Sequence, residues 1–244
     1  MEKKKITELV TLLEYFFDIT NKFQGNHVTS SIVIKSLLDL QSKLMRSTCV
    51  YFDSFRQSLL KNLNKPSRFQ NVVKDENFVI GTILDPRLKL QLFGKKTNTL
   101  YFETPTVSEA KLQIENVFQR FADLNNKSQV STTQEHEENC FDFLCESSVA
   151  HYSKSELDIY LEETNLPFNE SSNNSAVLDY WRANSVRFPI LCEIVKVYLA
   201  IPASSGDIER LFSIAGALKR QRRNRLKIKL VEQMLFIKDY YSSS

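Results

Sequence analysis

The sequence predicts an all-α protein, and three observations indicate this class. Glycine occurs 5 times and proline 6 times in 244 residues, so few residues interrupt regular structure. Apolar side chains recur at intervals of three and four over long stretches, which is the period of one helix face. No stretch alternates convincingly between apolar and polar residues as a half-buried strand does. With 42% hydrophobic residues, the chain can also bury a substantial core.

Two amphipathic stretches fill the first quarter of the chain. Apolar residues are spaced as on one helix face over residues 6–24, and the same pattern extends over residues 29–63. These stretches predict two or three long helices that pack on each other. An apolar run at residues 77–93 follows, and Pro86 interrupts it. Pro86 disfavours helical geometry at Asp85 and suits the first position of a new helix.

The next helix is expected to begin at Thr106. Glu109 follows Thr106 at the spacing of a capping box, in which each side chain bonds the backbone N–H of the other residue. Residues 125–153 then lack periodicity and are rich in polar groups, which predicts a flexible linker. Four further helical segments are expected: residues 154–163, a helix around Trp181, a helix opened by Pro189, and residues 227–241.

The stretch "ASSGDIERLFSIAG", residues 203–216, predicts one more helix. Ser204 and Asp207 have capping-box spacing, and Gly216 suits a C-terminal cap. Its expected buried face consists of Ile208, Leu211, Phe212 and Ala215.

Several functional classes are disfavoured by what the sequence lacks. It contains no glycine-rich nucleotide-binding motif, no hydrolase nucleophile motif and no H-E-x-x-H motif. Four scattered cysteines favour a reduced intracellular protein, and no apolar stretch predicts a signal peptide or membrane span. One group resembles a metal site, but its spacings do not fit a common zinc pattern, and incidental loop residues explain it better: His136, Cys140, Cys145 and His151. We therefore expect no metal and no cofactor.

Several segments resemble, in order, the C-terminal block of hAT-superfamily transposases. They are "SELDIYLEE", "LDYWRANSVRFPILCEIVKVYLAIPASSGDIERLFSIAG", "RRNRL" and "LVEQMLFIKDY". Upstream, "LLEYFFDIT" and "FVIGTILDPRLKLQLF" resemble the helical region that precedes this block. The resemblance implies three regions: a helical insertion-like region at 1–124, the linker at 125–153 and a dimerisation region at 154–244. It also implies that the C-terminal part is a remnant of an RNase H-like transposase core.

The resemblance assigns a family role to Glu209, which by itself is typical of a solvated helix charge. In that family, Glu209 corresponds to the third carboxylate of a catalytic set that also needs two aspartates on strands before the insertion. The chain is expected to begin inside the insertion and to lack those strands and a BED-type zinc finger. Asp53, Asp85 and Asp142 do not lie in strand-like contexts that could replace them. Because one carboxylate cannot hold the catalytic metals, we expect Glu209 to be vestigial and the chain not to be an enzyme by itself. The alternative is a fragment that contributes Glu209 in trans.

Without independent catalysis, the function that the resemblance implies for this chain is dimerisation. The expected partner is a second copy or a related transposase-like protein. Large apolar side chains suit such an interface, although the same residues could form the core of the monomer. The candidate interface residues are Trp181, Phe188, Tyr198, Leu199, Leu211, Phe212, Met234 and Phe236.

A basic run, "KRQRRNRLKIK" at residues 219–229, holds seven Lys or Arg and no acid. It could contact DNA phosphates without sequence specificity, act as a nuclear localisation signal, or form a solvated connection between helices. The residues expected to contact phosphate are Lys219, Arg220, Arg222, Arg223 and Arg225. The second candidate function is therefore a DNA-associated regulator, and the expected location is the nucleus.

Overall fold

A computed structural model describes residues 1–25, 28–63, 65–94, 102–130, 154–168, 175–218 and 228–242. Every regular element in these ranges is helical and none is a strand, which confirms the all-α prediction. None of the helices in the described ranges is long and apolar enough to cross a membrane.

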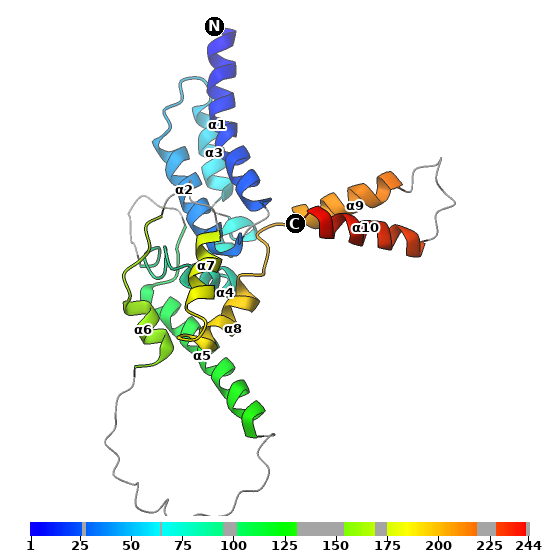
Figure 1. Ribbon diagram of the computed structural model, residues 1–244. Coiled ribbons are helices and arrows are strands. Elements are labelled where there is room, and N and C mark those ends of the chain that lie inside the picture. The colour runs from blue at the N-terminus through cyan, green and yellow to red at the C-terminus, as the bar shows by residue number, and fades with distance from the viewer. Residues whose placement is uncertain are drawn as a thin grey trace, which may run out of the picture.

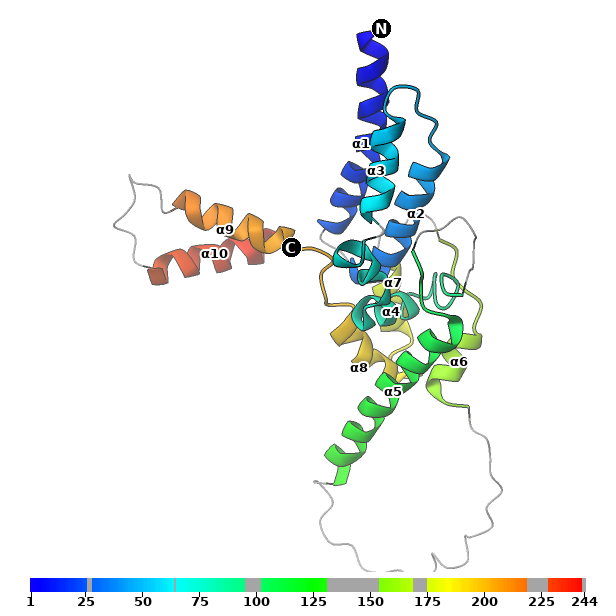
Figure 2. The ribbon, with the colours of Figure 1, turned by 180° about the vertical axis from the view of Figure 1, so that it is seen from behind.

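Three helices form the N-terminal end of the molecule: α1 (Glu2–Phe23), α2 (Val33–Arg46) and α3 (Asp53–Leu63). They lie side by side in both views of the ribbon (Figures 1 and 2). A short 3-10 turn, η1 (Ser30–Ile32), precedes α2. One face of α2 is buried against α1 and α3, and this face supplies four of the nine buried residues of the first hydrophobic core.

The chain then passes through two short turns into the middle of the molecule. A π-helical turn, η2 (Pro66–Gln70), and a 3-10 turn, η3 (Val72–Lys74), lead to α4 (Glu76–Ile83). Asp75 caps α4, since its carboxylate accepts a bond of 2.9 Å from the backbone N–H of Asn77. The residues Val79–Ile83 of α4 are all buried, because α4 packs against η1, α2, α5 and α8.

Residues 84–94 form a succession of turns, so the prediction that Pro86 opens a helix is wrong. The reason is the backbone at Lys89, because its left-handed conformation ends the turn that begins at Asp85. The Asp85 carboxylate accepts bonds from the backbone N–H and the guanidinium of Arg87, and Lys89 has a left-handed backbone with φ of 44°. The Lys89 ammonium donates to the carbonyl oxygens of Tyr160 and Glu163. These bonds tie the turns to α6.

The predicted capping box opens α5 (Val107–Val130). The backbone N–H of Thr106 donates to the Glu109 carboxylate at 2.7 Å, and the N–H of Glu109 donates to the Thr106 hydroxyl at 3.2 Å. The helix extends to Val130, so it includes the first six residues of the linker expected at 125–153.

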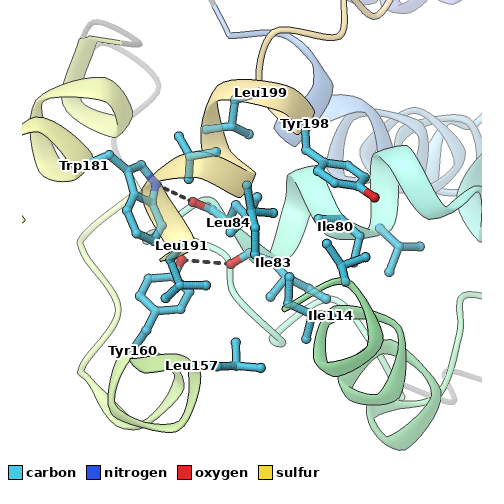
Figure 3. Packing of buried hydrophobic residues seen from close by; sticks show 14 of the residues in the cluster. Ile80, Ile83, Leu84, Ile114, Leu157, Tyr160, Trp181, Leu191, Tyr198 and Leu199 are labelled. Carbon is cyan, nitrogen blue, oxygen red and sulfur yellow. Dashed lines mark hydrogen bonds between the residues drawn. The ribbon is translucent and has the colours of Figure 1, made fainter. Parts of the chain in front are cut away.

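Three short helices complete the second core: α6 (Glu156–Glu162), α7 (Ser175–Ala183) and α8 (Pro189–Tyr198), which begins at Pro189 as predicted. Figure 3 shows how they pack around α4 and α5. The Trp181 indole donates to the Leu84 carbonyl at 2.8 Å, and the Tyr160 hydroxyl donates to the Ile83 carbonyl at 2.8 Å. This core combines residues from both sides of the expected linker. The three-region division stays a prediction, but regions 1–124 and 154–244 share one packing unit.

The last two helices, α9 (Gly206–Leu218) and α10 (Ile228–Ser242), pack against each other and project from the body (Figures 1 and 2). Their bounds correct one expectation. Helix α9 continues past Gly216, so this glycine is not its C-terminal cap. The Ser204 hydroxyl accepts a bond of 3.3 Å from the Gly206 N–H and donates a bond of 3.1 Å to the Phe23 carbonyl. Ser204 therefore bonds both to the start of α9 and to the last residue of α1.

A candidate dimerisation surface on the C-terminal hairpin

The α9–α10 hairpin is held at its base by the C-terminal end of α1. The Arg210 guanidinium donates to the Gln24 carbonyl at 2.5 Å, and the Ala203 N–H donates to the Thr29 hydroxyl at 2.9 Å. Gly206 allows this approach, since a Cβ atom there would lie 2.9 Å from Cγ of Gln24. The base of the hairpin is therefore fixed to the body, while its length extends outward (Figure 1).

Apolar side chains line the projecting hairpin and are exposed. On α9, Ile208 and Phe212 lie one turn apart on the same face, and Phe212 is 69% exposed. This corrects the expectation that these two side chains are buried. The exposed stripe on α10 has the i, i+4, i+7 spacing of one helix face, and Phe236 beside it is 74% exposed. The hairpin surface comprises Ile208, Phe212, Leu230, Met234, Phe236 and Ile237.

The structure places seven of the eight candidate interface residues in two groups. Phe212, Met234 and Phe236 belong to the exposed hairpin surface. Leu211 lies in α9, but its side chain is outside the described residues. The second core contains the other four, and Phe188 among them has no exposed area. These four side chains cannot contact a partner while the core is folded: Trp181, Phe188, Tyr198 and Leu199.

Aromatic contacts explain why these residues are in the core. The ring of Trp181 lies 5.0 Å from that of Tyr160 and 6.3 Å from that of Phe188, in tilted and edge-on arrangements. Such pairs add to the stabilisation from burial alone. The indole also needs an acceptor when it is buried, and the Leu84 carbonyl supplies one. Large apolar residues near the start of the dimerisation region therefore stabilise the monomer.

Glu209 is exposed on the first turn of α9. Its carboxylate accepts a bond of 2.6 Å from the Ser205 hydroxyl. In the part of the chain that the structure describes, no three His, Cys, Asp or Glu residues are grouped so that they could hold a metal ion. Asp85 is buried beside Arg87, and the Asp53 carboxylate is bonded to Arg56, which lowers the pKa of Asp53. The Glu209 carboxylate therefore bonds to the residue that directly precedes α9.

Several residues that were weighed as site candidates, including some that the sequence disfavours, lie outside the described residues. They are Asp142, the candidate metal group His136, Cys140, Cys145 and His151, and the five basic residues Lys219, Arg220, Arg222, Arg223 and Arg225. The basic run joins α9 to α10 in sequence and therefore follows one helix of the hairpin and precedes the other.

Sequence reasoning missed the polar cluster that joins the two halves of the second core. The Asp85–Arg87 pair and Lys89 fix the turns after α4 against α6 and the segment that follows it, where the Leu166 N–H donates to the Pro86 carbonyl at 3.0 Å. The Arg87 guanidinium also lies 4.8 Å from the centre of the Phe168 ring. The signal in the sequence is the run "LDPRLK", where three charged residues interrupt an otherwise apolar segment.

These features together define a helical protein with a projecting apolar hairpin, and comparison with known families identifies the class. Residues 156–241, from α6 through α10, match the hAT family C-terminal dimerisation region. This segment of the chain is thus similar to that dimerisation region, and the resemblance seen in the sequence is confirmed.

Curated relatives extend the similarity over nearly the whole chain. The putative AC transposase of Zea mays is 25% identical over 261 residues, covering 100% of this chain and 32% of the relative. The zinc finger BED domain-containing protein RICESLEEPER 3 of Oryza sativa subsp. japonica is 26% identical, covering 97% and 33%. The corresponding DAYSLEEPER protein of Arabidopsis thaliana is 23% identical, covering 99% and 35%. The chain therefore spans about a third of the length of these relatives.

Proposed function

We propose that this chain acts as a protein dimerisation module, pairing with a second copy or with a related transposase-like protein through the α9–α10 hairpin. The observation that carries the proposal is the exposed apolar surface of the hairpin, which lies within the matched dimerisation region. A pair of antiparallel helices has too few neighbours to bury two apolar faces by itself. A second hairpin would cover them in a four-helix arrangement.

The composition of the surface supports this role. Phe212, Met234 and Phe236 are large side chains of the kind that supply most of the energy of protein interfaces. The fixed base supports it as well. Because Arg210 and Ser204 hold the hairpin to α1, its direction is set before a partner arrives and less ordering is needed on binding.

Hydrogen exchange measured by mass spectrometry at two protein concentrations tests this proposal at the hairpin itself. We expect amides of α9 and α10 to exchange more slowly at the higher concentration. In the Phe212→Ser/Phe236→Ser variant, the dependence on concentration should disappear. A Glu232→Gln variant, which changes an exposed polar residue of α10, is the matched control and should behave like the unmodified chain. Equal exchange at both concentrations in the unmodified chain would refute pairing of the hairpin with a second copy.

DNA association is the second candidate function, and the charge of residues 219–229 favours it. Seven cations in eleven residues would bind phosphates with strong salt dependence and without reading the base sequence. A duplex titration at low and moderate salt, repeated with Arg222 and Arg223 changed to Gln, tests this function. Absence of binding at low salt excludes it. The same run is consistent with a nuclear location, which we propose for this chain.

We propose no independent catalysis for the chain. The alternative is that Glu209 completes a metal site whose other carboxylates come from another chain. Adding magnesium or manganese and a DNA substrate that carries transposon ends distinguishes the two. Cleavage by this chain alone that is lost in Glu209→Gln would refute the proposal, because this change removes the charge and keeps the shape of the side chain. Glu209-dependent cleavage that appears only when a related transposase-like chain is also added would show that the alternative is correct.

A further inference from the structure

A second apolar stripe lies on α1, on the face turned away from the rest of the protein. Ile6, Val10, Leu13 and Phe17 are all exposed, with Ile6 at 62% and Phe17 at 65%. Their spacing of four, three and four residues is the 3.5-residue repeat of a coiled-coil seam. The opposite face of α1 is already in use, because Leu12 is buried and Phe16, Ile19 and Phe23 pack on the first core.

The exposed stripe of α1 is therefore a surface against which another helix can pack. A short isolated helix is marginal in water, but α1 is held in place by α2 and by its contacts with residues 47–52. The Glu8 carboxylate, for example, accepts bonds from the backbone N–H groups of Val50, Tyr51 and Phe52. Pairing along the stripe would bury apolar area without the cost of forming the helix.

The charges of α1 indicate what covers the stripe. We infer that α1 pairs with α1 of a second copy in an antiparallel arrangement, with Ile6 of one copy beside Phe17 of the other and Val10 beside Leu13. Lys3 continues the stripe at its N-terminal end. A parallel pair would bring two Lys3 ammonium groups together at the seam, whereas the antiparallel register places Lys3 beside Thr20 of the second copy.

The wider charge distribution agrees with this orientation. The first half of α1 carries Lys3, Lys4 and Lys5 with Glu2 and Glu8, which gives a net charge of +1. The second half carries Glu14 and Asp18 with Lys22, which gives a net charge of −1. An antiparallel pair sets the basic end of each helix beside the acidic half of the other, and also opposes the two helix dipoles. This surface is separate from the hairpin, so the inference does not depend on the function proposed for α9 and α10.

Sedimentation equilibrium on the Phe212→Ser/Phe236→Ser chain isolates the α1 contact from the hairpin. We expect this chain to form a dimer at high micromolar concentration. Adding Val10→Glu should leave only monomer, because a charge at the seam would be buried without a partner. Adding Thr11→Glu, which places the same charge on a neighbouring exposed position, should leave the dimer intact. A milder Val10→Thr change, with helix content checked by circular dichroism, separates lost pairing from lost folding. A hairpin-disabled chain that stays monomeric throughout overturns the inference.

Cross-linking tests the orientation. Ile6→Cys and Phe17→Cys chains should form a mixed disulfide when they are combined, above the level given by the native cysteines alone. Neither variant should cross-link efficiently to itself, because two Ile6 positions lie at opposite ends of an antiparallel pair. Efficient Ile6→Cys self-linking would instead show a parallel pair and contradict the proposed register.

Discussion

The Asp85 carboxylate and the Arg87 guanidinium form an ion pair that is buried on both sides, with 2.6 Å between Oδ2 of Asp85 and Nη2 of Arg87. The side chains are 0% and 3% exposed. The Ser31 hydroxyl donates a further bond of 3.0 Å to the Asp85 carboxylate. This pair connects η1, the turns after α4 and, through Phe168, the segment that follows α6. It therefore joins the N-terminal helices to the matched dimerisation region.

Removing one member of this pair should destabilise the protein strongly. In Arg87→Leu, the Asp85 charge stays buried with too few partners, and losses of this kind are about 3–5 kcal/mol. Urea unfolding followed by circular dichroism measures the change in the free energy of unfolding. The matched control is Lys154→Ala, which breaks an exposed ion pair with Glu162 and should cost less than about 1 kcal/mol. Similar costs for the two variants would contradict the structural role of the buried pair.

Trp181 and Phe212 should respond in opposite ways to truncation. Trp181→Ala removes a buried ring and an indole bond to Leu84, so the free energy of unfolding should fall by about 3–5 kcal/mol. Phe212→Ala removes an exposed ring and should change the stability of the monomer by less than about 0.5 kcal/mol while weakening self-association. Thermal unfolding at low protein concentration and a dissociation constant for each folded variant measure the two effects. A Trp181→Ala chain of normal stability but weakened association would place Trp181 in the interface instead.

Glu8 should make part of the stability dependent on pH. Partial desolvation raises the pKa of Glu8, but the bonds from the N–H groups of Phe52, Val50 and Tyr51 outweigh it, and the pKa is lowered overall. A carboxyl whose folded pKa is lowered stabilises the protein fully above its unfolded value, about 4.3 for glutamate, and this contribution is lost as the pH falls through the lower folded value.

The measurement for Glu8 compares unmodified chain and Glu8→Gln in urea unfolding between neutral and acid pH. The unmodified chain should be the more stable at neutral pH, and the difference should shrink as the pH falls below the ordinary glutamate range. Glu14→Gln, which changes an exposed acid on the same helix, is the control and should show a smaller difference. A difference between the unmodified chain and Glu8→Gln that grows toward acid pH would contradict the stabilising role of the bonds between Glu8 and the N–H groups of residues 50–52.

The helices of this chain are largely predictable because their signals are local. Thr106 and Glu109 form the predicted capping box, Pro189 opens α8, and α10 at Ile228–Ser242 is close to the expected 227–241. Each signal depends only on residues within one or two turns of each other. The start of α9 was harder, because Ser204 bonds to Phe23, far away in the sequence.

Burial was harder to predict than helix position. Trp181 and Phe212 are both large apolar residues on amphipathic helices, and periodicity identifies the stripe but not what covers it. In the structure, Trp181 meets Tyr160 and Phe188, whereas Phe212 lies on a projecting helix. The buried Asp85–Arg87 pair was missed because its members lie two residues apart in a turn, where no helical period predicts that they are buried together.

The most direct test of the central claim, that the α9–α10 hairpin associates with another copy, is sedimentation equilibrium on the Val10→Glu chain, in which only the hairpin remains able to pair. We predict a mass of twice the 28.3 kDa of one chain at micromolar concentration. A mass of one chain at every concentration would contradict the claim.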